Sequence, residues 1–127
     1  MKKILFLLLV TVSTITNAQQ KQKVELVAPA AFEKKMAAQK GQVIDVRTPK
    51  EYQSGYIAGA VNMHVYDKDF EQRVDKLDKN KPVYVYCKAG GRSAEATEIL
   101  KNKGFKTIVE LDGGMDAWKE AGKPVKQ

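Results

Sequence analysis

Short apolar segments alternate with amphipathic segments along most of the chain, and this alternation limits the possible folds more than any other feature. Each expected strand is short and rich in apolar residues, and the strands cover residues 24–27, 43–46, 60–65, 83–86 and 107–111. The expected helices lie between and after them, at residues 29–41, 48–55, 69–79, 93–104 and 115–122. Strands that are apolar throughout and separated by helices are typical of a parallel sheet covered on both faces. The sequence predicts a small α/β domain with a mostly parallel central sheet of about five strands.

Two of the expected helices have clear sequence signals. Pro29 is favourable at the first position of a helix, and Gly41 is favourable at the end of one, so a helix is expected between them. Phe70, Val74 and Leu77 recur at i, i+4 and i+7, which predicts an amphipathic helix over residues 69–79.

The first residues have the layout of a secretory signal peptide. Met1-Lys2-Lys3 is positive, residues 4–12 are almost wholly apolar, and a more polar stretch leads to the small residue Ala18. The apolar run is far shorter than the ~20 residues that span a bilayer. We expect residues 1–18 to be removed on export to the periplasm or outside the cell, without a stable membrane anchor. Residues 19–127 then form one domain.

Composition narrows the function further. The net charge of +7 comes from scattered lysines, which favours a solvated basic surface over nucleic-acid binding. One cysteine, Cys87, cannot form an internal disulfide, and one histidine, His64, adds too few soft ligands for zinc. Cys87 is therefore either a buried, inert thiol or a thiol kept for its chemistry, and no metal or cofactor is expected. His64 is expected to be structural.

The segment after the fourth expected strand has the residue types of an anion cradle. Glycines let the backbone aim successive N–H groups inward, and the next helix adds its free N–H groups and positive dipole end. Two cations lie within five residues of the thiol, and such surroundings lower a thiol pKa. Cys87 is the expected nucleophile, and the expected binding residues are Lys88, Ala89, Gly90, Gly91, Arg92 and Ser93. The alternative is a small buried cysteine beside an ordinary glycine turn.

Three ordered motifs resemble the rhodanese sulfurtransferases. The first, at residues 44–60, contains Ile-Asp-Val-Arg-Thr-Pro and ends Gly-Tyr-Ile-Ala-Gly-Ala, where the family usually has Gly-His-Ile-Pro-Gly-Ala. The second is Tyr-Cys-x-x-Gly-x-Arg-Ser at residues 86–93, and the third is Leu-Asp-Gly-Gly at residues 111–114, followed by Trp118. The matches extend over nearly the whole expected domain. The resemblance implies a rhodanese-like fold for residues 19–127.

The resemblance also implies a ping-pong mechanism. Cys87 would take a sulfur atom from a small anionic donor such as thiosulfate and hold it as a persulfide, which cyanide, a thiol or an acceptor protein would then discharge. Such a compact domain is expected to be a monomer. Asp45 and Arg47 are expected to form a structural ion pair rather than to line the site. Trp118 with Met115 is expected to belong to the core beneath the loop rather than to contact substrate.

Three alternatives remain open. Related phosphatases and arsenate reductases resemble Cys-x₅-Arg, whereas only four residues separate Cys87 from Arg92, which favours sulfur over phosphate. A non-catalytic rhodanese-like binding module is disfavoured because such modules commonly lack the cysteine. A carrier that passes persulfide sulfur to a partner protein shares the same chemistry and differs only in its acceptor.

Overall fold

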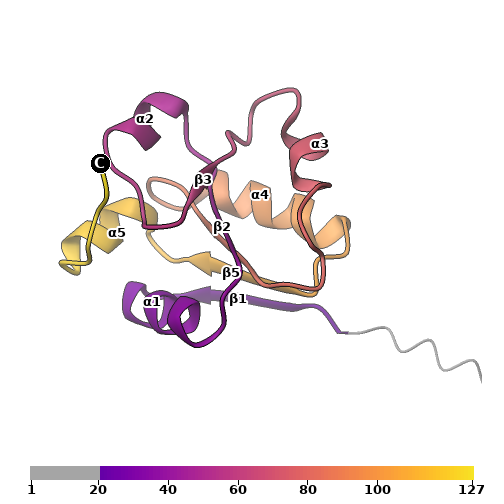
Figure 1. Ribbon diagram of the computed structural model, residues 1–127, viewed down its shortest axis with the longest axis horizontal. Helices are drawn as coiled ribbons and strands as arrows, with labels where there is room; N and C mark the ends of the chain where they lie inside the picture. Colours follow the sequence, from indigo (N-terminus) through magenta and orange to yellow (C-terminus); the bar gives the residue numbers. More distant parts are fainter. Residues whose placement is uncertain (1–20) are drawn as a thin grey trace, which may run out of the picture.

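The computed structural model describes residues 21–127, so the expected signal peptide lies outside the described part of the chain. The strands are β1 (Lys23–Val27), β2 (Gln42–Asp45), β3 (Val61–Asn62), β4 (Val83–Tyr86) and β5 (Thr107–Leu111). The helices are α1 (Pro29–Ala38), α2 (Pro49–Gln53), α3 (Phe70–Val74), α4 (Gly91–Asn102) and α5 (Gly114–Glu120). All strand pairs are parallel and the order is β1-β5-β4-β2-β3, which confirms the predicted α/β class (Figure 1).

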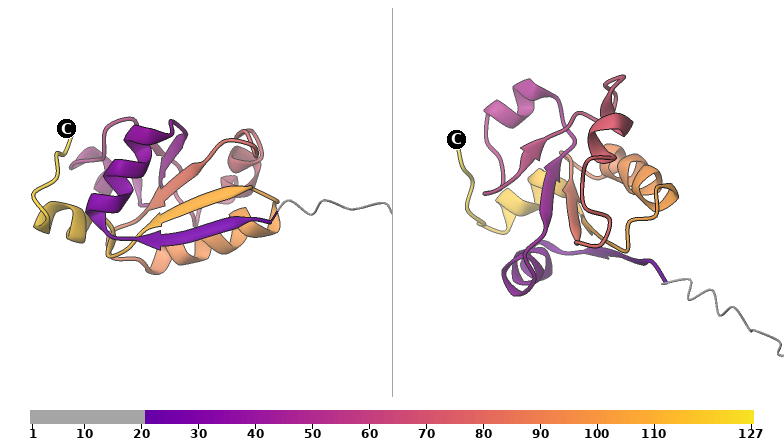
Figure 2. Two further views of the ribbon diagram at one scale, coloured as in Figure 1. Left: turned by 90° about the horizontal axis from the view of Figure 1, so that it is seen from below. Right: turned by 45° about the vertical axis from the view of Figure 1, so that its right-hand side comes forward.

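Helices cover both faces of this sheet. α1 and α4 lie on opposite sides of it (Figure 2). The two faces have separate apolar cores, one including Phe70 of α3 and Leu100 of α4, the other including Phe32 of α1 and Trp118 of α5. Burial of both faces explains why all four positions of the central strand β4 are apolar or aromatic, rather than alternate ones only.

Strand β4 lies at the centre of the sheet, between β5 and β2. Its four residues are all buried. Because side chains alternate along a strand, Val83 and Val85 face the core under α4, whereas Tyr84 and Tyr86 face the core under α1. Cys87 continues the first set and belongs to the core on the α4 face.

Two predicted elements are shorter than expected. The helix predicted over residues 69–79 is regular only over α3, because the chain turns after it. The side chain of Gln42 binds the backbone of Asp78 in this turn. The Gln42 amide donates to the Asp78 carbonyl (2.9 Å), and the Gln42 side-chain oxygen accepts from the Asp78 N–H (2.6 Å). Leu77 nevertheless packs against the core, as its spacing predicted. The strand predicted over residues 60–65 is regular only at β3.

The expected structural roles of three residues are confirmed. Asp45 and Arg47 are 0% and 3% exposed, and Arg47 Nη2 lies 2.6 Å from Asp45 Oδ2. Trp118 is buried, and its indole N–H donates to the carbonyl of Pro124 (2.8 Å).

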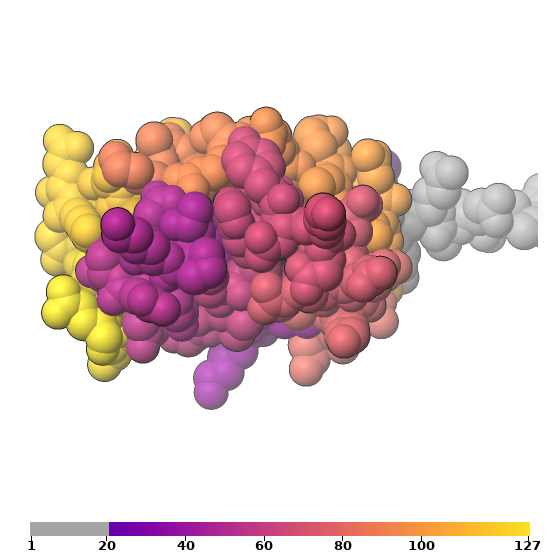
Figure 3. Space-filling model, turned by 90° about the horizontal axis from the view of Figure 1, so that it is seen from above, coloured from indigo at the N-terminus to yellow at the C-terminus, as the bar shows by residue number. Residues whose placement is uncertain are grey.

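The end of the chain packs beside the segment after α2. Tyr56 and Lys126 exchange backbone hydrogen bonds of 2.9 and 2.8 Å, and the last residues adjoin this region in the space-filling view (Figure 3). Among the described residues, no helix is both long and apolar enough to cross a membrane.

Candidate active site

The candidate site is the loop between β4 and α4. Cys87 directly follows the central strand, and α4 begins at Gly91, so the predicted site residues 87–93 occupy the loop and the first helical turn. Gly90 has a φ of +127°, a conformation that L side chains rarely adopt, and it directs the chain into the helix. Binding sites of open α/β sheets gather at this carboxyl edge.

The thiol of Cys87 is enclosed by this turn. The residue is 1% exposed. The backbone N–H of Gly90 donates to Sγ at 3.0 Å, and Sγ lies 3.5 Å from the hydroxyl of Ser93 in the first turn of α4. The sulfur therefore accepts a hydrogen bond from the loop, and the thiol donates one to the start of a helix.

These contacts lower the pKa of Cys87 below its usual value. Burial is the largest influence and acts in the opposite direction, because it disfavours the charged thiolate. Hydrogen bonds from the Ser93 hydroxyl and from the backbone N–H groups of Ser93, Gly90 and Ala89 together outweigh it. The loop therefore favours the thiolate, which is the nucleophilic form.

The start of α5 fixes the loop from the other side. Backbone N–H groups of Met115 and Asp116 donate to the carbonyls of Cys87 (2.8 Å) and Lys88 (3.0 Å). The approach is so close that a Cβ on Gly114 would lie 2.5 Å from the Cys87 carbonyl oxygen. The glycine pair of the third motif thus allows one helix end to dock directly on the loop backbone.

Both cations of the loop are paired with acids. Lys88 Nζ lies 2.8 Å from Asp116 Oδ2 at the exposed rim. Arg92 donates to Glu51 through two bonds, Nη1 to Oε1 (2.6 Å) and Nη2 to Oε2 (2.9 Å). The pair lowers the pKa of Glu51 to about 2 and raises that of Arg92. The sequence predicted that Lys88 and Arg92 lie near the thiol, but it did not predict that each is paired with an acid, Asp116 or Glu51.

Glu51 is held in place by the start of α2. The Thr48 hydroxyl accepts from the N–H of Glu51 (3.2 Å), and the Glu51 carboxylate in turn accepts from the hydroxyl (3.1 Å) and N–H (3.4 Å) of Thr48. This is the reciprocal pattern of a capping box. The same carboxylate thus caps one helix and binds the loop before another.

A second surface near the loop follows β3. Tyr66 is largely exposed, and its pKa is raised chiefly by a hydrogen bond to Glu95, with smaller contributions that include the charge of Cys87. His64 packs edge-on against Tyr66 and lies 3.3 Å from Asp67. These contacts agree with the expected structural role of His64.

A buried acid beneath the loop was not predicted from the sequence. Glu110 of β5 is 9% exposed, its Oε2 lies 2.8 Å from the Ser93 hydroxyl, and its Oε1 lies 3.4 Å from the Thr97 hydroxyl. The signal in the sequence was an acid placed between apolar residues of the strand.

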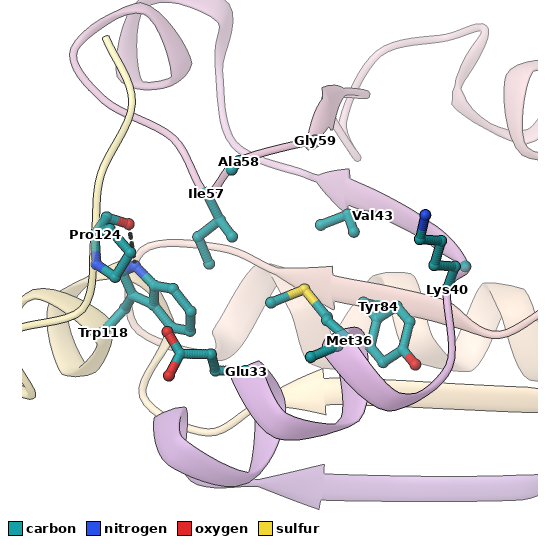
Figure 4. A pocket seen from close by; sticks show the side chains of 12 residues that line it. Glu33, Met36, Lys40, Val43, Ile57, Ala58, Gly59, Tyr84, Trp118 and Pro124 are labelled. Atoms are coloured by element: carbon teal, nitrogen blue, oxygen red, sulfur yellow. Dashed lines mark hydrogen bonds between the residues drawn. The ribbon is translucent and has the colours of Figure 1, made fainter.

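Two further features lie away from this chemistry. Within residues 21–127, no group of three or more His, Cys, Asp or Glu side chains could hold a metal ion. A cavity of about 490 Å³ is lined by apolar side chains that include Met36, Ile57, Tyr84 and Trp118 (Figure 4). These residues lie in the core on the α1 face or pack against it, whereas Cys87 lies in the core on the α4 face.

The described residues form an α/β domain with a buried thiol on a glycine-containing loop at the end of its central parallel strand. The model of the rhodanese-like domain family matches residues 28–121, and the chain belongs to this family. The resemblance seen in the motifs is thereby confirmed.

Relatives and solved structures agree with this assignment. The chain is 43% identical over 74 residues to the thiosulfate sulfurtransferase PspE of Escherichia coli, covering 57% of this chain and 68% of PspE. It is 33% identical over 89 residues to the putative sulfur carrier protein YrkF of Bacillus subtilis, covering 69% of this chain and 47% of YrkF. A crystal structure of a rhodanese-related protein from Thermoplasma volcanium superposes with a TM-score of 0.71 at 32% identity, covering 80% of this chain and 97% of that one. The chain spans about half to three-fifths of the length of some curated relatives.

Proposed function

We propose that this protein is a sulfurtransferase that carries a sulfane sulfur as a persulfide on Cys87. The observation that carries the proposal is the Gly90 N–H aimed at Sγ from 3.0 Å, at the start of the 12-residue helix α4. A helix start and inward N–H groups favour negative charge, and both the thiolate and a persulfide are anions.

The reaction takes place in two balanced steps. The Cys87 thiolate attacks the outer sulfur of thiosulfate, the new S–S bond forms, and sulfite leaves with the electron pair of the old one. Cyanide or a thiolate then attacks the outer sulfur of the persulfide, leaves as thiocyanate or a new persulfide, and regenerates the Cys87 thiolate. A donor without an ionisable proton needs no base in either step once the thiolate exists.

The spacing between Cys87 and Arg92 favours sulfur over phosphate as the transferred group. Only four residues separate them, one fewer than in the related phosphatase pattern.

Mass spectrometry of the purified protein tests the proposal. After thiosulfate treatment the protein should gain one sulfur atom, cyanide should remove it, and the Cys87→Ser variant should gain none. Failure to form an adduct with any sulfane donor would contradict a sulfur-transfer function. A Glu98→Gln variant, changed at an exposed position of α4 away from the loop, is the control and should gain the sulfur atom as the wild type does.

A protein acceptor is the second candidate, favoured by the similarity to a relative named as a sulfur carrier. Incubating the ³⁵S-loaded protein with an extract and following the label separates the two candidates. Transfer to one protein band supports a carrier, whereas release only to small thiols supports turnover.

We also propose that residues 1–18 direct export of the chain, on the basis of their sequence pattern alone. N-terminal sequencing of protein recovered from the producing cells tests this. A mature chain starting near Gln19 is expected, and a chain that retains Met1 in the cytoplasm would contradict export.

A further inference from the structure

Glu110 is a buried acid that the two-step reaction does not use. Its side chain lies on the α4 face of the sheet, as does Cys87 on the neighbouring strand, because the β4–β5 register places Glu110 beside Val85. In the described part of the chain no lysine, arginine or histidine forms an ion pair with it, and its polar contacts are the hydroxyls of Ser93 and Thr97.

Ser93 stands between this acid and the thiol. Its hydroxyl oxygen lies 2.8 Å from Glu110 Oε2, 3.0 Å from the Gly90 carbonyl oxygen and 3.5 Å from Cys87 Sγ. A serine hydroxyl has one proton to donate, so it serves one of these acceptors at a time. The charged carboxylate is the nearest and the strongest acceptor. In this arrangement the thiol donates to Ser93 and Ser93 donates to Glu110.

Formation of the thiolate changes this arrangement. A thiolate needs the Ser93 proton for its own stabilisation, and a charged Glu110 would then lose its short hydrogen bond and face a second buried negative charge. The other ionisable groups around the thiol are Arg92 with its partner Glu51, Tyr66 with its partner Glu95, and the rim pair of Lys88 and Asp116. These groups reach the loop from α4, α2, the segment after β3 and α5, whereas Glu110 approaches from β5 underneath.

We propose that Glu110 is a positioning residue that competes with Cys87 for the Ser93 hydroxyl proton and so sets how readily the thiol ionises. When the thiol loses its proton, the Ser93 hydroxyl turns from Glu110 to the sulfur, and Glu110 gives up its shortest hydrogen bond. Ionisation of Cys87 therefore costs more with Glu110 in place than it would without the carboxylate. The inference rests on the proposed function only in taking Cys87 as the sulfur carrier.

The pH dependence of Cys87 alkylation by iodoacetamide tests this without any sulfur donor. Glu110→Gln keeps the size of the side chain but removes its charge, so the alkylation midpoint should fall by roughly one pH unit or more. In that background the Ser93 proton is free for the sulfur, and adding Ser93→Ala should raise the midpoint by more than it does in the wild type. Glu98→Gln, an equal charge change on the exposed face of α4, is the matched control and should leave the midpoint unchanged.

A midpoint that is unchanged or raised in Glu110→Gln would overturn the inference, as would equal effects of Ser93→Ala in both backgrounds. Carbon-13 NMR of the wild type covers the case in which Glu110→Gln does not fold. The Glu110 carboxyl resonance should move over the pH range in which Cys87 becomes reactive, and this movement should vanish when Cys87 is blocked as a methyl disulfide. A resonance indifferent to the block also contradicts the inference. Failure of the protein to take up sulfur would contradict the proposed function but would not change the pH dependence of Cys87 alkylation.

Discussion

Arg92 and Glu51, 41 residues apart in the chain, form a two-bond ion pair with Nη1–Oε1 and Nη2–Oε2 distances of 2.6 and 2.9 Å. The pair joins the first turn of α4 to the start of α2, so the loop arginine is neutralised by a residue from another motif. Both side chains are partly exposed, and the charge of each therefore acts on solutes that approach the loop.

Substitutions on the two sides of this pair should affect thiosulfate binding in opposite directions. Arg92→Ala leaves the Glu51 carboxylate unpaired beside the loop, so the KM for thiosulfate should rise by roughly tenfold at low salt. Glu51→Gln frees the Arg92 charge and should lower the KM. Steady-state kinetics with thiosulfate and cyanide measure both, and an equal rise in KM for the two variants would show that the pair acts only by holding α2 against α4.

The same pair should make the fold sensitive to acid. The pKa of Glu51 is lowered from 4.5 to about 2 in the folded protein, so the ionised carboxylate stabilises the fold fully above pH 4.5. This contribution is lost as the pH falls from about 4.5 through about 2. Urea unfolding at pH 7 and pH 3 should show a smaller loss of stability for Glu51→Gln than for the wild type. Equal losses in both proteins would contradict the assignment.

Gly114→Ala should damage the docking of α5 on the loop. Its φ of +57° disfavours any side chain, and the new Cβ would also lie 2.5 Å from the Cys87 carbonyl oxygen. We expect a loss of about 1–3 kcal/mol of unfolding free energy, with a fall in sulfur-transfer rate. Gly122→Ala is the matched control, because its φ of +71° is similar but no atom lies within 4 Å of the added Cβ. Denaturant unfolding should show the larger loss for Gly114→Ala, and equal losses would mean that the backbone conformation alone matters.

Asp45→Asn should be among the most destabilising single changes. It leaves the guanidinium of Arg47, 3% exposed, without its carboxylate partner, and breaking a buried pair in this way costs about 3–5 kcal/mol. Glu98→Gln breaks the exposed pair with Lys101 and should cost at most about 1 kcal/mol. Thermal and urea unfolding compare the two, and similar losses would contradict a structural role for the buried pair.

Local sequence patterns predicted the positions of the strands, of most helices and of the loop that contains Cys87, although β3 is shorter than predicted. These features depend on residues close together in the chain, such as the helix start at Pro29 or the run Val83–Tyr86 before the thiol. Helix α3 was overestimated because the spacing of Leu77 reports burial, and a turn held by Gln42 buries that residue as well as a helix would.

The partners of the loop could not be predicted in the same way. Nothing in the sequence around Glu51 pointed to Arg92. Glu110 contacts Ser93 because β4 and β5 are neighbours in the sheet, and strand order is not visible in a single sequence. Both contacts are set by the packing of elements that are distant in the chain.

The near-complete burial of Cys87 bears on how long a stored sulfur atom would last. A fully exposed persulfide would react with the first thiol or oxidant that reached it, whereas a reagent must displace part of this loop to reach the buried sulfur of Cys87. Its lifetime would then depend on the frequency of loop opening and on the size of the reagent rather than on intrinsic reactivity. The hydrogen bonds from α5 to the loop backbone, and from the Gly90 N–H to the sulfur, would therefore set the rate at which the sulfur is released.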